Sequence, residues 1–211
     1  MKEYQVYLFD MDGTLVNSEP LKGKALSLAC RDYGVEVDVD LYKDVMGESW
    51  TIVTQYFFKH GNISPELDAF NRYFRGHYEL LLAENISLIT GVKPYIKALK
   101  DAGKTCGVVS SAASWMVDNI LQATGLDDAF DVVITQEDVT KHKPDPAAYH
   151  LALARLNALP ENTLIFEDSN AGVLAGNASG CDVIAIQHAF NGNNDLSCAL
   201  KRIESYEQVS I

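Results

Sequence analysis

Two aspartates one residue apart, Asp10 and Asp12, follow directly after the apolar run 6–9. Such a run is typical of a buried strand, and a strand that ends here directs the Asp10 carboxylate into the crevice at the carboxyl edge of an open α/β sheet. Gly13 lets the chain turn away at once, so both carboxylates and nearby backbone N–H groups can face one small ligand. The spacing predicts Mg²⁺ and phosphate chemistry. The alternative is an ordinary strand followed by a solvated Asp-Gly turn.

Two later motifs supply groups that suit a phosphoryl ligand. Ser110 and Ser111 follow the apolar run 105–109, and their hydroxyls can donate hydrogen bonds to phosphoryl oxygens. Lys143 lies in a proline-rich loop and can bring a positive charge to the crevice. Each motif alone has an ordinary alternative, because a Ser-Ser turn is a common helix N-cap and a loop lysine is usually solvated.

Two adjacent acids, Glu167 and Asp168, end the apolar run 163–166. Such acids are costly beside Asp10 unless a cation binds among them. The alternative is that Asp168 or Ser169 caps the following helix.

The composition limits the kinds of partner and site. The formal net charge of −12 argues against nucleic acid or an anionic membrane as a partner, because both attract basic surfaces. A phosphorylated substrate remains compatible if a divalent cation reverses the local field. No apolar segment is long enough to cross a bilayer and no signal-type run is present, so we expect a soluble cytoplasmic protein. The scattered cysteines form no C-x-x-C pair and predict neither zinc nor disulfides.

Alternating apolar runs and helical patterns predict an α/β fold with a doubly wound, Rossmann-like parallel sheet. The expected strands are residues 6–9, 105–109, 131–135, 163–166 and 183–186, and Asn191 to Asn194 form a turn after the last of them. The expected helices of this part are 91–102, 114–124, 146–156 and 171–179.

Residues 16–87 interrupt this alternation with helical patterns at 21–33, 41–45, 50–60 and 65–83. The stretch is too long for one crossover helix and contains no convincing strand. We interpret it as a helical cap domain inserted over the crevice, with hinges at 16–19 and 85–91. The catalytic core then comprises residues 1–15 and 88–211.

In this order and on these elements, the motifs resemble those of the haloacid dehalogenase superfamily. The resemblance covers residues 4–187 and is close to the cap-bearing branch of beta-phosphoglucomutase-like proteins and sugar-phosphate phosphatases. It implies that Asp10 is the nucleophile and Asp12 the general acid and base. It also implies that Ser110 and Lys143 hold the transferring phosphoryl group, with Ser111 beside them.

The same resemblance implies a Mg²⁺ site. Its ligands would be the Asp10 carboxylate, the Asp12 backbone carbonyl and Asp168, with Glu167 in or beside that shell. The second acid, Asp12, also separates this chain from the dehalogenases of the superfamily, which lack it because no alkoxide leaves.

Most departures from the resemblance concern the cap. Beta-phosphoglucomutase-like relatives carry an arginine in the cap loop and a histidine on the first cap helix, and the matching residues here are Trp50 and Lys22. Both changes favour a phosphatase over a mutase. Trp50 and Lys22 are also candidates for substrate contact, although the spacing of Trp50 equally suits cap core. His142 stands where many members have glycine. Other cap residues that either touch substrate or form a solvated face are Lys24, Arg72 and Arg75.

The sequence therefore predicts a Mg²⁺-dependent phosphatase of small phosphorylated metabolites, sugar phosphates above all, that works through a phosphoaspartate. One alternative is a phosphohexose mutase of the same fold. Another is a non-catalytic metabolite-binding module. Retention of Lys143 among the acids speaks against that module, because folding alone gains nothing from clustered carboxylates.

Overall fold

A six-stranded parallel sheet forms the centre of the molecule, in the order β3-β2-β1-β4-β5-β6. The computed structural model describes residues 2–210. The strands are β1 (Val6–Phe9), β2 (Thr105–Val109), β3 (Val132–Ile134), β4 (Thr163–Glu167), β5 (Asp182–Ile186) and β6 (Lys201–Ile203). The strand order reverses direction next to β1, which creates the crevice where open α/β sheets bind ligands. The predicted doubly wound α/β fold is confirmed.

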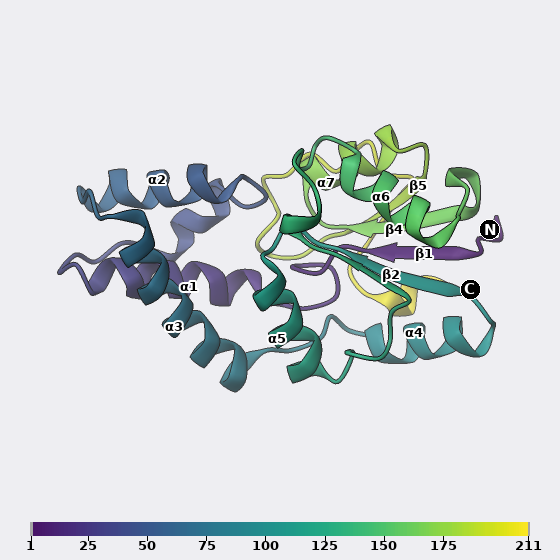
Figure 1. The fold of residues 1–211 in the computed structure, drawn as a ribbon, viewed down its shortest axis with the longest axis horizontal. Helices are drawn as coiled ribbons and strands as arrows, with labels where there is room; N and C mark the ends of the chain where they lie inside the picture. Colours follow the sequence, from purple (N-terminus) through teal and green to yellow (C-terminus); the bar gives the residue numbers. More distant parts are fainter. Residues whose placement is uncertain (1, 211) are drawn as a thin grey trace.

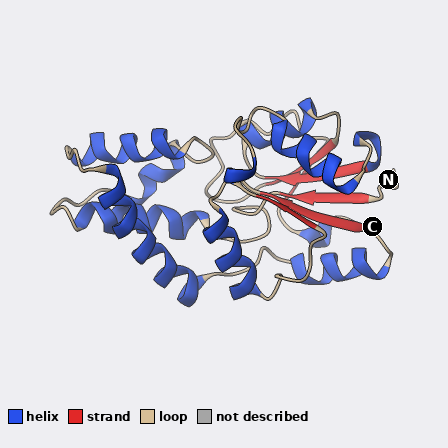
Figure 2. Cartoon of the chain, in the orientation of Figure 1, coloured by secondary structure: helices blue, strands red, loops and turns tan. Residues whose placement is uncertain are grey.

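Helices cover both faces of this sheet (Figures 1 and 2). On one face Tyr7 and Phe9 of β1 pack with α4 (Val92–Asp101) and α5 (Ser114–Thr124). On the other face Val6 and Leu8 pack with α6 (Ala147–Leu156) and α7 (Asn170–Ala178). Because successive side chains of a strand alternate between faces, a strand buried on both sides must be apolar throughout, as β1 is.

The helical segment lies beyond the carboxyl ends of the strands, at the left of Figure 1. It contains α1 (Glu19–Arg31), the 3-10 helix η1 (Val39–Asp44), α2 (Trp50–Gly61) and α3 (Leu67–Asn85). Within residues 17–87 the described chain has no strand, as the patterning predicted. Buried aromatic side chains of α2 and α3, among them Phe57, Phe70 and Phe74, form the interior of this segment. Its division from the core as a separate cap domain stays a prediction.

The two connections to the helical segment run side by side. Val16 and Leu88 form an antiparallel β-bridge. Asn17 N–H donates to the Ser87 carbonyl at 2.8 Å, and Ile89 N–H donates to the Leu15 carbonyl at 2.9 Å. The segment therefore leaves and rejoins the sheet at neighbouring points, close to Asp12.

The prediction of only five strands was wrong, because β6 adds a sixth at the edge of the sheet. Its three residues pair with Ile184, Ala185 and Ile186 of β5. Lys201 and Arg202 are exposed, so the strand carries no apolar run that patterning could detect. Among residues 2–210, no helix has the length and apolar character needed to cross a membrane.

Candidate active site

The predicted site residues meet because three parallel strands end side by side. Asp10 follows β1, Ser110 follows β2 and Asp168 follows β4. β1 lies between β2 and β4, and the Asp10 N–H donates to the Phe166 carbonyl of β4 at 2.9 Å. Parallel pairing thus brings to one edge residues that are far apart in the chain.

Lys143 connects two of the acids at this edge. Its Nζ lies 2.6 Å from Asp10 Oδ1 and 2.6 Å from Glu167 Oε1, and it donates to the Val109 carbonyl at 3.0 Å. Burial by itself would lower the pKa of Lys143, but the carboxylates of Asp10 and Glu167 outweigh it and raise that pKa. The Tyr149 hydroxyl donates a hydrogen bond to Glu167 Oε1 at 2.7 Å, which fixes the Glu167 carboxylate. Lys143 is thus a permanent cation aimed at Asp10.

Three carboxylates form a cluster that suits a metal ion. Oxygens of Asp10, Glu167 and Asp168 all lie within 4.8 Å of one another, and all three residues are buried. Burial raises the pKa of Asp10 and of Asp168, and repulsion from neighbouring acids raises both further. Three acids against the single cation Lys143 leave an excess of negative charge. A hard divalent cation, which prefers oxygen ligands, fits both the donor set and this excess.

Two glycines are required by the packing of these acids. Gly13 has a φ of +74°, and a Cβ there would lie 2.1 Å from Asp168 Oδ2. A Cβ on Gly172 would lie 1.9 Å from the Glu167 carboxyl carbon. Any larger side chain at either position would displace a carboxylate of the cluster.

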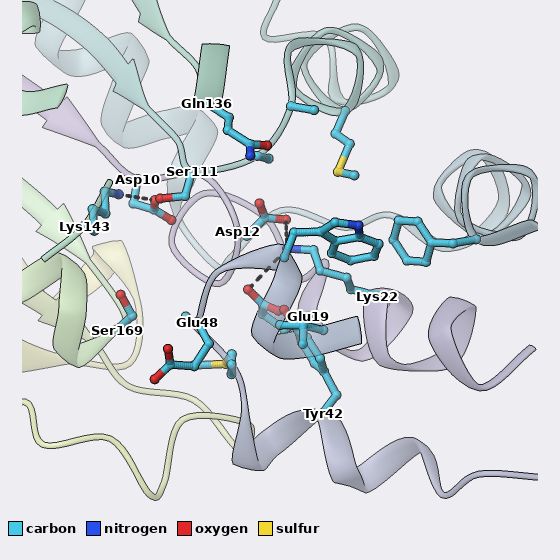
Figure 3. Close-up of a pocket in the computed structure, with 18 of the residues that line it drawn as sticks. Asp10, Asp12, Glu19, Lys22, Tyr42, Glu48, Ser111, Gln136, Lys143 and Ser169 are labelled. Atoms are coloured by element: carbon cyan, nitrogen blue, oxygen red, sulfur yellow. Dashed lines mark hydrogen bonds and ion pairs between the residues drawn. The ribbon is translucent and has the colours of Figure 1, made fainter. Parts of the chain in front are cut away.

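Asp12 is not part of the three-acid cluster. It accepts a hydrogen bond from the Ser18 hydroxyl, and Lys22 Nζ lies 3.2 Å from its Oδ1. Lys22 Nζ is also 3.7 Å from Glu19 Oε1, so the lysine lies between two acids (Figure 3). Burial raises the pKa of Glu19, and the Asp12 charge raises it further, while Lys22 opposes both. Asp12 thus has its own positive and hydroxyl partners, independent of Lys143.

A cavity of about 450 Å³ joins the two groups of acids. From the sheet edge it is lined by Asp10, Ser111 and Asp168, and from the helical segment by Lys22 and Trp50. In Figure 3 the Lys22 side chain reaches toward Asp12, while Asp10 lies beside Lys143. A small ligand held in this cavity would contact both halves of the molecule.

Comparison with known proteins agrees with this geometry. Residues 7–186 match the model of the haloacid dehalogenase-like hydrolase family. The chain belongs to this family.

Several relatives in the family are named phosphatases. A phosphorylated carbohydrates phosphatase of Thermotoga maritima is 28% identical over 193 residues, which cover 91% of this chain and 89% of that protein. Hexitol phosphatase A of Escherichia coli is 33% identical over 181 residues, covering 85% of this chain and 82% of that protein. In structure, CbbY of Rhodobacter sphaeroides in complex with xylulose-(1,5)bisphosphate matches with a TM-score of 0.89 and 25% identity over 98% of this chain and 96% of that chain.

The N-caps of α5 and α7 bear on the alternative roles of the serines after β2 and of Asp168. Ser169, not Asp168, is the N-cap of α7, because its Oγ accepts from Gly172 N–H at 3.0 Å. Asp168 therefore remains available to the acid cluster. Neither serine after β2 caps α5, whose N-cap is Ala113. Ser110 Oγ accepts from Ala112 N–H at 3.0 Å, whereas Ser111 lines the cavity.

The candidate cap residues differ in whether they line the cavity, pack against the protein, or do both. Trp50 lines the cavity, yet its indole Nε1 donates to Asn71 Oδ1 at 2.9 Å and its ring packs against Phe74. Arg72 and Arg75 also line the cavity, and Arg75 lies over the Trp115 ring of α5 at 4.4 Å. The Lys24 side chain is not among the cavity residues.

The only non-glycine residues with positive φ in the described chain are two asparagines, so the backbone at His142 does not need glycine.

Sequence reasoning missed three residues around the acids. Glu19 lines the cavity, Tyr149 holds Glu167, and His188 Nε2 lies 2.9 Å from Asp168 Oδ2. His188 comes two residues after the end of β5, so the rule that strand ends carry functional groups could have found it. Tyr149 lies within an apolar helix pattern and Glu19 in an ordinary first turn, and neither context carries a signal.

Proposed function

We propose that the protein is a Mg²⁺-dependent phosphatase that hydrolyses small phosphorylated metabolites, preferentially sugar or polyol phosphates, through a phosphoaspartate at Asp10. The observation that carries the proposal is the convergence of Asp10, Lys143 and the acids after β4 on a cavity that Asp12 also lines. According to their names, two of the relatives above are phosphatases of phosphorylated carbohydrates and of hexitol phosphates.

In this proposal Asp10 attacks the phosphorus atom, an O–P bond forms, and the bond from phosphorus to the leaving oxygen breaks. Lys143 and the Ser110–Ser111 turn hold the phosphoryl oxygens. Mg²⁺ would be held by the carboxylates of Asp10, Glu167 and Asp168 together with the Asp12 backbone carbonyl. When bound, it would neutralise charge on the phosphoryl group.

Asp12 is assigned the proton transfers. It gives its proton to the departing alkoxide and then accepts one from the water that hydrolyses the phosphoaspartate. The Ser18 hydroxyl and Lys22 hold its carboxylate in place between these steps. The helical segment closes the cavity from outside and excludes water from the first step.

The lining of the cavity favours a substrate rich in hydroxyl groups. Glu19 is buried, and its Oε2 has no hydrogen-bond partner among the described residues. A buried carboxylate oxygen of this kind is satisfied by a hydroxyl donor. Trp50 and Phe74, with ring centroids 4.5 Å apart, add an apolar wall that suits the C–H face of a sugar.

One observation favours the alternative, a phosphohexose mutase. Arg72 lines the cavity from the helical segment and could grip a second phosphate. Against it, Trp50 is engaged by Asn71 and Lys22 by two acids, so neither replaces the missing arginine of the mutases.

The test is a screen of phosphate monoesters with and without Mg²⁺, scored by phosphate release and kcat/KM, with Asp10→Asn as the control. We expect free phosphate from hexose 6-phosphates or polyol phosphates. The mutase alternative is tested with beta-glucose 1-phosphate, Mg²⁺ and a trace of the 1,6-bisphosphate, followed by phosphorus NMR. Glucose 6-phosphate that accumulates faster than inorganic phosphate would replace the phosphatase by the mutase.

A further inference from the structure

The loop after β5, residues 187–194, contacts Asp168 of the acid cluster. His188 Nε2 lies 2.9 Å from Asp168 Oδ2, and the Phe190 N–H donates to His188 Nδ1 at 3.2 Å. Since Nδ1 accepts, the ring proton is on Nε2, which therefore donates to the carboxylate. One of the two Asp168 oxygens is thus occupied by a neutral donor. The other, Oδ1, has no hydrogen bond within the described residues.

Two asparagines of the same loop hold this arrangement in place. Asn191 is 1% exposed; its Nδ2 donates to the carbonyls of Asp168 and Ile186, both at 2.8 Å. Its Oδ1 accepts from the His188 N–H at 2.9 Å. Asn194 Oδ1 accepts from the Asn170 N–H at 2.9 Å, at the start of α7. The loop therefore fixes both the backbone and the side chain of Asp168.

We propose that His188 is a positioning residue that restricts Asp168 to a single ligand oxygen and thereby makes the site select Mg²⁺ over Ca²⁺. The inference rests on the metal site of the proposed function and concerns which cation that site accepts. Mg²⁺ requires a near-octahedral shell and takes few carboxylate oxygens, whereas Ca²⁺ accepts six to eight oxygens and often binds a carboxylate through both.

The surroundings of Asp168 oppose any rearrangement toward two-oxygen binding. Gly13 lies so close that a Cβ there would be 2.1 Å from Asp168 Oδ2 and 2.8 Å from His188 Nε2. The carboxylate is therefore confined between the Gly13 backbone and the imidazole. Partners of metal-bound carboxylates typically change metal affinity by about 10-fold to 100-fold when they are removed.

The test compares two amide substitutions that differ in length. In His188→Gln the amide nitrogen reaches about the position of Nε2, whereas in His188→Asn it ends near Nδ1 and cannot donate to Asp168. Isothermal titration calorimetry of the metal-free protein with MgCl₂ and CaCl₂, without substrate, gives both affinities. We expect His188→Asn to lose about 10-fold to 100-fold in Mg²⁺ affinity and much less in Ca²⁺ affinity, while His188→Gln stays within about threefold of wild type.

His77→Asn is the matched control, because it removes a histidine–carboxylate pair of the helical segment, His77 Nε2 to Asp32 Oδ2 at 2.6 Å, remote from the acids. Its metal affinities should equal those of wild type. Far-ultraviolet circular dichroism checks each fold, and His188→Leu serves if the asparagine variant does not fold.

Unchanged Mg²⁺ affinity in the shortened variant, or an equal loss for both cations, would overturn the role of His188. So would a wild-type protein that binds no Mg²⁺. Phosphate release by the wild type is scored separately, so a failure of the phosphatase proposal is recognised independently of these affinities.

Discussion

The two sides of the cavity are built differently. At the sheet edge three buried acids face the single cation Lys143, so the charges there do not balance. On the helical side two of the polar groups that line the cavity are paired nearby: Lys22 with Glu19, and Trp50 with Asn71. In the proposed function, the sheet edge binds the cation and the phosphoryl group. On the helical side Glu19 lines the cavity, and its buried Oε2 has no hydrogen-bond partner among the described residues.

This difference separates reactivity from selectivity. Changes at the sheet edge should affect every substrate alike, whereas changes on the helical side should affect some substrates and spare others. Substitutions on each side of the cavity test that separation.

Asp10→Asn should reduce phosphate release by more than about 10⁴-fold for every substrate, the scale seen when a nucleophile is removed. The amide keeps the size of the side chain but cannot attack phosphorus. Because burial raises the pKa of Asp10, its charged form costs stability at neutral pH, and the variant should melt at a higher temperature than metal-free wild type. Turnover within tenfold of wild type would remove Asp10 from the reaction.

Asp12→Asn should lower kcat for alkyl phosphates by about 10²-fold to 10⁴-fold, the usual contribution of general acid and base catalysis. Aryl phosphates, whose leaving groups need no proton, should lose less in the first step. The comparison needs conditions in which phosphorylation limits the rate. An equal loss for alkyl and aryl phosphates would show that Asp12 acts by structure alone.

Glu19→Gln should lower kcat/KM for polyol phosphates by about 10-fold to 100-fold, because a hydrogen bond to a charged group contributes about 1.5–3 kcal/mol. With p-nitrophenyl phosphate, which has no hydroxyls to bind, kcat/KM should stay within about threefold. Parallel kinetics on both substrates measure the ratio. A matching loss on the aryl phosphate would mean that the two sides of the cavity are not separable.

Substitution of Asp138, which lies after β3 at the same sheet edge, should have the smallest effect and serves as a contrast to the acids of the cluster. The Thr135 backbone N–H and Arg155 lower its pKa, and it closes a capping box with Thr135. Asp138→Asn should cost about 0.5–1 kcal/mol of stability at pH 7 and leave activity unchanged, because the group is partly in water.

The folded-state pKa of Asp138 lies below its unfolded value of about 3.9, so this stabilisation is present above that pH. It is lost as the pH falls through the folded pKa. In urea melts, the difference between wild type and variant should therefore be larger at pH 7 than at pH 3. A difference of equal size at both pH values would assign the effect to packing.

Much of the fold was predictable because its signals are local. The apolar runs of β1 and β2 and the pattern of α5 gave element bounds that agree with the structure. β6 was not predictable, since two of its three residues are exposed and its existence depends on pairing with β5. Tertiary contact decides such an edge strand, and no window of sequence contains that information.

The residues of the site also differ in whether the sequence alone could predict them. Asp10 and Asp168 were predictable because each follows a buried strand, and the geometry of parallel strands brings them together. Glu19 was not predictable, because its importance lies in an oxygen that the fold leaves without a partner. Trp50 was predicted both as cap core and as substrate contact, and it packs on Phe74 while lining the cavity.

The paired connections at Val16 and Leu88 have a consequence for how such a chain can evolve. A segment that departs and returns at adjacent points can be lengthened, trimmed or replaced without rethreading any strand. The contacts among Asp10, Lys143 and Glu167 lie outside this segment, so a change in the helices between the connections leaves them in place.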